Sequence, residues 1–259
     1  MSVKQIYTYS SLGNFTYLVE EEGKAWVIDP YSSEQIIEII EKNNLKLEGI
    51  INTHDHWDHT KGNRGLSFKY GCKVYVHKNS LKVIDCATDG VTDGKVINFS
   101  DDKYLQVFET PGHTASHICL SYYEDQTLKA VFTGDTLFNA GVGNCRNGGD
   151  PVELYGSISG LFYPLSNEVV VYPGHDYIKN NLNFTLSVEK NNKMAKDLLT
   201  RIEKEFVGDY CSYITTIGEE KEMNTFFRLK NEEIRKFLNK AHASDKEVFI
   251  HLRSLRDQW

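Results

Sequence analysis

The sequence predicts an α+β protein in which a strand-rich N-terminal part is followed by a helical C-terminal part. From Lys4 to about Pro173, short runs rich in β-branched and aromatic residues alternate with turn residues and a few helix-like stretches. After about Gly174 these runs stop and helix formers dominate, as in residues 190–206 and 232–240. We therefore expect two domains, a larger one over residues 1–176 and a small helical one over residues 177–259.

Individual elements follow from local patterns. Two apolar runs, residues 15–19 and 25–28, flank Glu21-Glu22-Gly23-Lys24, and this predicts a hairpin. Ser33 is the expected cap of a helix in which isoleucines recur at positions 36, 37, 39 and 40. Further strands are expected at residues 49–52, 74–76, 105–108, 118–120, 130–132 and 169–172. Chemically suggestive residues follow several of these strands directly, on loops that a rigid sheet would position.

Composition restricts the classes of function. The formal net charge of −7 argues against a nucleic-acid partner, because such proteins gather Lys and Arg to face phosphates. No run approaches the roughly 20 apolar residues that span a bilayer, and the N-terminus lacks the apolar segment of a secretory signal. The five cysteines are scattered without CxxC spacing, which is typical of reduced thiols. We expect a cytoplasmic protein with no nucleic-acid or membrane partner.

The strongest chemical signal is Thr53-His54-Asp55-His56-Trp57-Asp58-His59, directly after the strand at residues 49–52. In an extended segment His54 and His56 point the same way, because side chains alternate with a period of two. If the chain then turns into a helix, Asp58 and His59 can point to a second position nearby. A surface loop could hold one histidine for no chemical reason, but packing gives no reason to gather three imidazoles and a carboxylate. Such ligands suit Zn, Fe or Mn better than Ca or Mg.

Three more candidate ligands follow later strands. His113 lies in Thr110-Pro111-Gly112-His113, Asp135 in Thr133-Gly134-Asp135-Thr136, and His175 in Tyr172-Pro173-Gly174-His175. Each of these segments alone is an ordinary turn. Together with the first segment they supply seven ligands in chain order: His54, His56, Asp58, His59, His113, Asp135 and His175.

This order, HxHxDH and then His, Asp and His after successive strands, resembles the metallo-β-lactamase superfamily. The resemblance covers about residues 3–176 and implies a four-layer αββα sandwich with a catalytic metal centre at the strand ends. The family pattern assigns His54, His56 and His113 to one metal ion, Asp58, His59 and His175 to the other, and Asp135 as the bridge. Asp58 and Asp135 are accordingly the carboxylates expected to serve catalysis. We expect two divalent transition metal ions per chain; zinc is the expected metal, and iron and manganese are the alternatives.

Further residues resemble the glyoxalase II family, the hydroxyacylglutathione hydrolases. The similar stretches are residues 54–63, 134–141 and 172–184, the helical C-terminal part with Asn224-Thr225-Phe226-Phe227-Arg228, and the closing Arg253-Ser254-Leu255-Arg256-Asp257. The resemblance implies that the helical domain binds substrate, and that Tyr177, Asn181, Arg253 and Arg256 contact it.

One segment departs from the family. Glyoxalase II usually has Gly-Cys-Gly, then Lys or Arg, then an aromatic residue, whereas this chain reads Gly141-Val142-Gly143-Asn144-Cys145-Arg146. Asn144 stands where a basic residue would meet a glutathione carboxylate, and Arg146 stands near the aromatic position. Both are kept as expected substrate contacts. Either Arg146 supplies the missing charge or the acyl carrier is another thiol.

The resemblance implies hydrolysis of a small-molecule thioester of the S-lactoylglutathione type to a hydroxy acid and a free thiol. Bound metal lowers the pKa of water toward about 7, so that a nucleophile exists at neutral pH. A thiol of pKa about 8.5 leaves readily as thiolate, and no protein general acid is required. The oligomeric state does not follow from the sequence.

Other functions are possible on the same scaffold. A lactonase would use nearly the same ligands, but the basic pair of the helical tail favours the thioester. A persulfide dioxygenase-like oxidoreductase would hold one iron through His54, His113 and Asp135, and residues 147–151 resemble that family a little more. Against it, every ligand of the second metal is retained. A nuclease is disfavoured by the acidic charge, and a class B β-lactamase by the absence of Cys at position 135. A protein that only stores metal or binds thiols is disfavoured by the complete ligand set.

Overall fold

The computed structural model describes residues 2–206 and 210–259, which form two compact units. The first unit consists of Met1–Glu109, Ser116–Gly134 and Tyr172–His175, and the second of Thr110–Ala115, Asp135–Val171 and Asp176–Trp259. The chain therefore passes between the units several times. The last passage, after His175, lies next to the predicted domain boundary at residue 176, and the earlier passages have no counterpart in the prediction.

The first unit contains a sheet with the strand order β1-β2-β3-β4-β5-β6. Its strands are β1 (Ser2–Tyr7), β2 (Phe15–Glu21), β3 (Lys24–Ile28), β4 (Lys46–Ile51), β5 (Lys73–His77) and β6 (Asp89–Val91). Pairing is antiparallel from β1 to β3 and parallel from β3 to β6. The predicted hairpin is β2–β3, and its turn residues Glu22 and Gly23 have φ of 49° and 76°. Positive φ at both positions is what a two-residue turn needs to match the twist of its strands.

Two helices of the first unit, α1 (Ser33–Lys42) and α3 (Asn63–Tyr70), pack on one face of this sheet. The side chain of Ser32, one residue before the predicted cap, accepts a hydrogen bond from the Gln35 amide and so begins α1. The helices contribute buried side chains at the spacing expected for one helical face. This core includes Ile36, Ile40 and Leu66 from the helices and Leu18, Ala25, Val27, Ile50, Val74 and Val76 from alternating strand positions.

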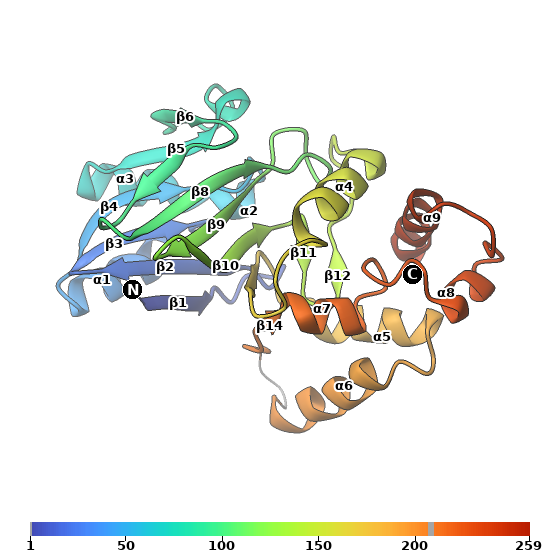
Figure 1. Cartoon of the computed structure of the whole chain (residues 1–259). Helices are drawn as coiled ribbons and strands as arrows, with labels where there is room; N and C mark the ends of the chain where they lie inside the picture. The colour runs from blue at the N-terminus through green and yellow to red at the C-terminus, as the bar shows by residue number, and fades with distance from the viewer. Residues whose placement is uncertain (1, 207–209) are drawn as a thin grey trace. The chain divides into compact units, whose positions relative to one another are not determined.

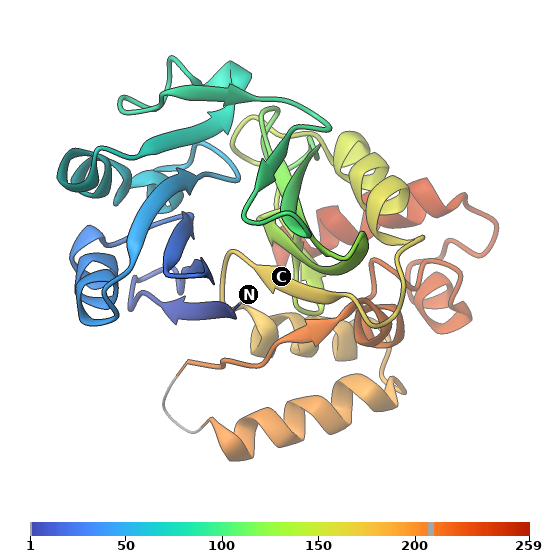
Figure 2. The same ribbon diagram turned by 60° about the vertical axis from the view of Figure 1, so that its left-hand side comes forward.

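A second sheet lies against the other face of the first one. Its strands in the first unit are β7 (Val96–Asn98), β8 (Lys103–Glu109), β9 (Ile118–Glu124) and β10 (Thr127–Gly134), all antiparallel, and the end of β13 (Val170–Pro173) lies beside β10. The ring of Tyr17 contacts Phe132 with 5.3 Å between ring centroids, and Trp26 contacts Phe99 at 4.3 Å. The first unit thus supplies three layers, helices, sheet and sheet, which Figure 2 shows at its left and centre.

The second unit is mainly helical (Figure 1, yellow to red). Its helices are α4 (Pro151–Ser157), continued by a π-helical turn η2 (Ile158–Phe162), α5 (Ile178–Val188), α6 (Lys193–Glu205), α7 (Ile217–Met223), α8 (Glu232–Phe237) and α9 (Asp245–Gln258). A short hairpin pairs β11 (Leu137–Phe138) with β12 (Gly141–Val142), and β14 (Thr215–Thr216) pairs with the start of β13. The helix predicted over residues 232–240 ends early, because Asn239 adopts the left-handed conformation, φ 55°.

The helices of the second unit enclose their own core. Ala140 at the tip of the β11–β12 hairpin packs against Ile178 and Leu182 of α5, and Ala195, Leu198 and Ile202 of α6 complete the group. The hairpin therefore belongs with the C-terminal helices rather than with the strands that precede it in sequence. Among the described residues no helix is both long enough and apolar enough to cross a membrane.

Candidate active site

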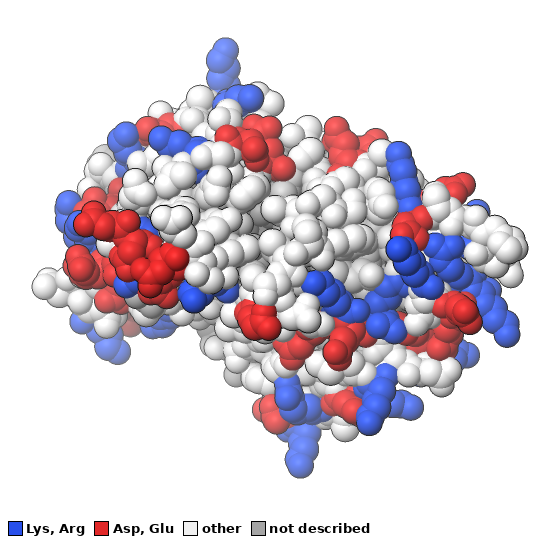
Figure 3. Space-filling model, in the orientation of Figure 1, with Lys and Arg blue, Asp and Glu red and all other residues white. Residues whose placement is uncertain are grey.

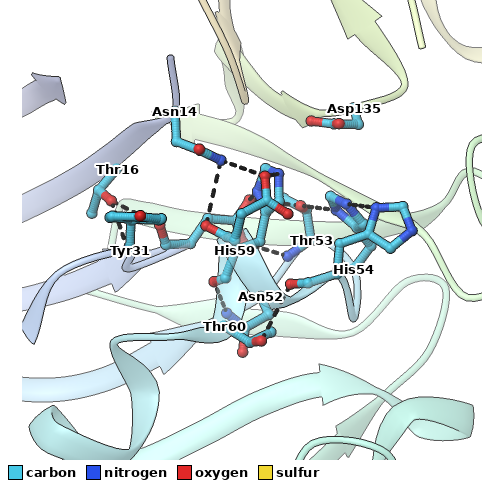
Figure 4. Close-up of polar contacts among 12 residues, drawn as sticks. Asn14, Thr16, Tyr31, Asn52, Thr53, His54, His59, Thr60 and Asp135 are labelled. Atoms are coloured by element: carbon cyan, nitrogen blue, oxygen red, sulfur yellow. Dashed lines mark hydrogen bonds and ion pairs between the residues drawn. The ribbon is translucent and has the colours of Figure 1, made fainter. Parts of the chain in front are cut away.

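The histidine-rich segment leaves β4 and enters a short helix, the arrangement considered for it from the sequence. β4 ends at Ile51, His56 is still extended with φ −63° and ψ 141°, and α2 (Trp57–Thr60) begins directly after it. His54, Asp58 and His59 are buried. Figure 4 shows His54 and His59 in this segment, close to Thr53.

Asp58, His59 and His175 bring their ligand atoms together in the first unit. Nε2 of His59 lies 3.1 Å from Nε2 of His175, and each of these nitrogens lies 3.5 Å from Oδ2 of Asp58. A tetrahedral metal ion with bonds of about 2.0–2.1 Å separates its ligand atoms by about 3.3 Å. Three buried donor atoms at this spacing fit one transition metal ion.

A second pair of ligand atoms lies at the start of the same segment. Nε2 of His54 is 3.0 Å from Nδ1 of His56, again the separation expected for two ligands of one ion. The first unit thus brings together five of the seven predicted ligands, and it does so in two groups.

The other ring nitrogen of His59 and of His175 is held by a hydrogen bond. Nδ1 of His59 lies 2.9 Å from Oδ2 of Asp29, and Nδ1 of His175 lies 2.9 Å from the carbonyl oxygen of Leu12. Because a carboxylate or carbonyl oxygen only accepts, Nδ1 carries the hydrogen and Nε2 keeps its lone pair for a metal ion. This is the usual arrangement of histidines that bind metal in proteins.

Two residues of this arrangement were missed by the sequence analysis, Asp29 and Asn14. The Asp29 carboxylate accepts from the Thr53 amide at 2.8 Å and from the Thr53 hydroxyl at 2.6 Å, in addition to its contact with His59. It lies within reach of the ligand atoms, but its bond to the far nitrogen of His59 makes it an orienting group rather than a ligand. Nδ2 of Asn14 donates to Oδ2 of Asp58 at 2.8 Å.

A sequence signal existed for one of the two. Asp29 follows the apolar strand β3 directly, in the same way that the predicted ligands follow their strands. Asn14 precedes a strand and belongs to no ligand pattern, so nothing in the sequence set it apart.

The remaining predicted ligands, His113 and Asp135, lie together in the second unit. Nε2 of His113 is 3.4 Å from Oδ2 of Asp135, and both residues are buried. Nδ1 of His113 is 2.7 Å from the carbonyl oxygen of Asn144, so the Nδ1 atom carries the hydrogen here too. The spacing of the two ligand atoms again suits two ligands of one metal ion.

The second unit also contains a pocket of about 170 Å³, which we call the carrier pocket. All six residues predicted to contact the substrate line it: Asn144, Arg146, Tyr177, Asn181, Arg253 and Arg256, together with Phe138, Val142 and Asp257. Three of these are arginines, which makes the pocket suited to an anionic ligand. Figure 3 shows Lys and Arg side chains gathered over the C-terminal helices at the right.

The three arginines are in different environments. Arg253 is 5% exposed, and burial lowers its pKa. Arg256 is partly buried, and its Nη2 donates to Oδ1 of the neutral Asn181 at 3.3 Å. Burial and then the nearby Arg253 lower its pKa. Arg146 is exposed and donates to the backbone oxygen of Asp257.

Comparison with known proteins supports one family over the whole chain. Residues 11–85 and 88–175 match the metallo-β-lactamase superfamily, and residues 176–259 match the C-terminus of hydroxyacylglutathione hydrolase. The hydroxyacylglutathione hydrolases of Nitrosococcus oceani and of a Polaromonas species are 37% and 39% identical to this chain, with 100% of both chains covered. The chain belongs to the hydroxyacylglutathione hydrolase family.

Membership in the hydroxyacylglutathione hydrolase family confirms the predicted resemblance and the metallo-β-lactamase fold with its helical C-terminal part. Among solved structures, the chain is similar to ETHE1 from Myxococcus xanthus, with a TM-score of 0.66 and 26% identity over 99% of this chain and 98% of that one. The clusters of His and Asp described above are able to bind metal ions, as expected.

Proposed function

We propose that this chain hydrolyses thioesters of the hydroxyacylglutathione type, S-lactoylglutathione among them, to a hydroxy acid and a free thiol. The observation that carries the proposal is the carrier pocket, where the six predicted substrate contacts line one cavity; three of them are arginines, against the single carboxylate of Asp257. The full-length relatives that bear this activity in their names support it. A lactonase has no comparable use for a cationic pocket.

We propose further that the seven predicted ligands hold two metal ions, zinc first, with His54, His56 and His113 at one ion and Asp58, His59 and His175 at the other. Asp135 would serve both. The separations of 3.0 to 3.5 Å between ligand atoms of His54 and His56, of Asp58, His59 and His175, and of His113 and Asp135 suit residues that share an ion. When bound, the ions supply a nucleophile from water at neutral pH and stabilise the charge that develops on the carbonyl oxygen.

The chain's own residues hold the ligands and bind the substrate. Asp29 and the Leu12 carbonyl fix two imidazoles, and Asn14 holds one oxygen of Asp58. In the carrier pocket Arg256 and Arg146 offer charge to a carboxylate of the thiol carrier, and Arg146 supplies the charge that the family has at position 144. The departing thiol leaves as thiolate and needs no acid from the protein.

The proposal is tested on one sample by three measurements: thiol release from S-lactoylglutathione, oxygen consumption with a persulfide of glutathione, and metal content. We expect thiol release, no oxygen consumption and about two transition metal ions per chain. A single iron with oxygen-dependent persulfide oxidation would overturn the hydrolase assignment.

A cytoplasmic location is proposed as well. All five cysteines are free thiols, which suits a reducing compartment.

A further inference from the structure

Arg253 and Arg256 lie one helical turn apart on α9 and both line the carrier pocket, yet their contacts differ. Arg256 touches side chains: Asn181, and the rings of Phe184 and Trp259. The guanidinium of Arg253 instead donates to backbone carbonyl groups of a segment that is distant in sequence. Its Nη1 donates to the carbonyl oxygens of Val142 and Gly143, at 2.9 and 3.1 Å.

We propose that Arg253 is a positioning residue: it holds the segment Val142–Asn144 so that the Asn144 carbonyl orients the metal ligand His113. This inference rests on the metal assignment of the proposed function. It concerns only residues of the second unit, and it gives Arg253 a task beyond binding the substrate.

The first step is the hydrogen bonding of Arg253 to the segment Val142–Asn144. The guanidinium is buried, its Nη2 donates to Oδ1 of Asp257 at 2.9 Å, and the ring of Phe226 lies 5.6 Å away. Hydrogen bonds from a charged donor are the strong ones, and a buried charge that loses its acceptors is strongly destabilising. These hydrogen bonds therefore fix the carbonyl groups of Val142 and Gly143 relative to the Arg253 guanidinium.

The second step is the lack of space around the segment. A Cβ atom added to Gly143 would lie 1.9 Å from the carbonyl oxygen of Asp135 and 3.2 Å from Nδ1 of His113. The Gly143 amide also donates to the Thr136 carbonyl at 3.3 Å. With so little space, a shift of the segment toward or away from the ligands changes their surroundings directly.

The third step is the bond to the ligand itself. The carbonyl that follows Gly143, that of Asn144, accepts from Nδ1 of His113 at 2.7 Å. This bond selects the tautomer with Nε2 unprotonated and fixes the orientation of the ring. Partners of this kind typically contribute 10- to 100-fold to metal affinity. Release of the segment by loss of Arg253 therefore weakens the metal site without touching a ligand.

The test compares Arg253→Ala with Arg256→Ala, a matched loss of one cation from the same helix and the same pocket. Metal-free protein is titrated with Co²⁺ and with Zn²⁺, and the ring nitrogens of His113 are followed by ¹⁵N NMR before metal is added. We expect Arg253→Ala to lower metal affinity about tenfold and to lose the Nδ1–H signal of His113. Arg256→Ala should leave both unchanged.

Two further variants separate positioning from general damage. Arg253→Lys retains one charged donor, so part of the lost affinity should return. Gly143→Ala keeps Arg253 but displaces the segment, and it should weaken metal binding in the same way. These two variants also serve if Arg253→Ala fails to fold by circular dichroism.

The inference is overturned if Arg253→Ala, or Gly143→Ala where Arg253→Ala does not fold, binds metal like the wild type with an unchanged His113 spectrum. Because the measurement uses metal and not substrate, this outcome is distinct from a failure of the proposed function, which would appear as absent thiol release in a protein that binds two metal ions normally.

Discussion

Asp55 and Asp58 lie three residues apart in the same histidine-rich segment, but the fold gives them opposite surroundings. Asp58 is buried among ring nitrogens of His59 and His175. Asp55 is partly exposed, and its carboxylate faces the hydroxyls of Ser80 and Ser116 at 3.4 and 3.5 Å. The helical turn of α2 makes this difference, because it carries Asp58 inward after the extended residues.

The first prediction compares these two carboxylates. Asp58→Ala should reduce bound metal from about two ions per chain to about one, because the group of Asp58, His59 and His175 loses one of its ligands. Metal content after dialysis against metal-free buffer measures this. Asp55→Ala is the matched control and should keep both ions; equal metal loss in the two variants would contradict the assignment of Asp58.

Asn14 gives a second prediction at the same scale. Its side-chain amide donates to Oδ2 of Asp58 at 2.8 Å, so Asn14→Ala should weaken binding of the proposed ion at Asp58 by 10- to 100-fold. Competition with a coloured chelator measures the change. Asn43→Ala, at the exposed residue that follows α1 and whose side-chain amide donates to the Ile39 carbonyl, should not alter affinity. Unchanged affinity in Asn14→Ala would show that the metal alone orients Asp58.

At the scale of elements, the β11–β12 hairpin is held by three side chains from C-terminal helices. Its Ala140, at φ 59°, donates its amide to both oxygens of Glu220 at 3.1 and 3.0 Å. Asn181 donates to the Asn139 carbonyl at 2.9 Å, and Asn224 donates to the Gly141 carbonyl at 3.2 Å. The predicted substrate contact Asn181 therefore also supports the wall of the carrier pocket.

The buried carboxyl of Glu220 leads to a prediction of pH-dependent stability. Burial raises the pKa of Glu220 to about 7. Between the ordinary value near 4.5 and about 7, the folded protein holds a proton that the unfolded chain has lost. The free energy of unfolding should therefore fall by about 3 kcal/mol as pH rises through this window.

Glu220→Gln removes this titration and keeps an acceptor for the Ala140 amide. Urea unfolding at a series of pH values should show that the variant loses less stability than the wild type from pH 4.5 to 7.5. Glu222→Gln, at an exposed position of the same helix, is the control. Parallel profiles for wild type and Glu220→Gln would refute a raised pKa.

The tail helix α9 carries the prediction on substrate binding. Arg256 is partly buried beside the neutral Asn181, and a charge-assisted hydrogen bond contributes about 1.5–3 kcal/mol when shielded. At about 1.4 kcal/mol per tenfold, Arg256→Ala should raise KM for S-lactoylglutathione about tenfold or more, with kcat nearly unchanged. A neutral short-chain thioester should be affected little. If both substrates respond alike, the carrier pocket does not bind the thiol carrier.

Features that neighbouring residues determine were predicted from the sequence. Features that depend on residues far apart in the sequence were not. The order of the ligands identified the fold, and the resemblance to glyoxalase II named Arg253 and Arg256 as substrate contacts. Their different roles depend on Val142 and Gly143, more than 100 positions away in sequence, whose carbonyls only the folded chain presents to Arg253. Asn14 escaped notice for the same reason, since its partner Asp58 lies 44 residues further on.

At the scale of the whole molecule, metal binding should contribute to stability. Ligands that bind only the folded chain stabilise it in proportion to the logarithm of their concentration over Kd, about 4 kcal/mol at 1,000 times Kd. Removal of metal by a chelator should therefore lower the melting temperature, and addition of Zn²⁺ should restore it. Scanning calorimetry measures both steps. An identical melting temperature with and without metal would contradict specific metal binding by the folded chain.

The hairpin at residues 137–142 has a consequence for engineering within this family. In the sequence, the C-terminal helices form a continuous segment that could be exchanged between relatives to change the accepted thiol. Yet Glu220, Asn224 and Arg253 bind backbone atoms of residues 140–143, so a transplanted tail depends on a recipient hairpin that presents these backbone groups at the same positions. A graft that includes residues 135–171 together with 176–259 carries its own hairpin, so it should unfold at a higher temperature than one that begins at residue 177.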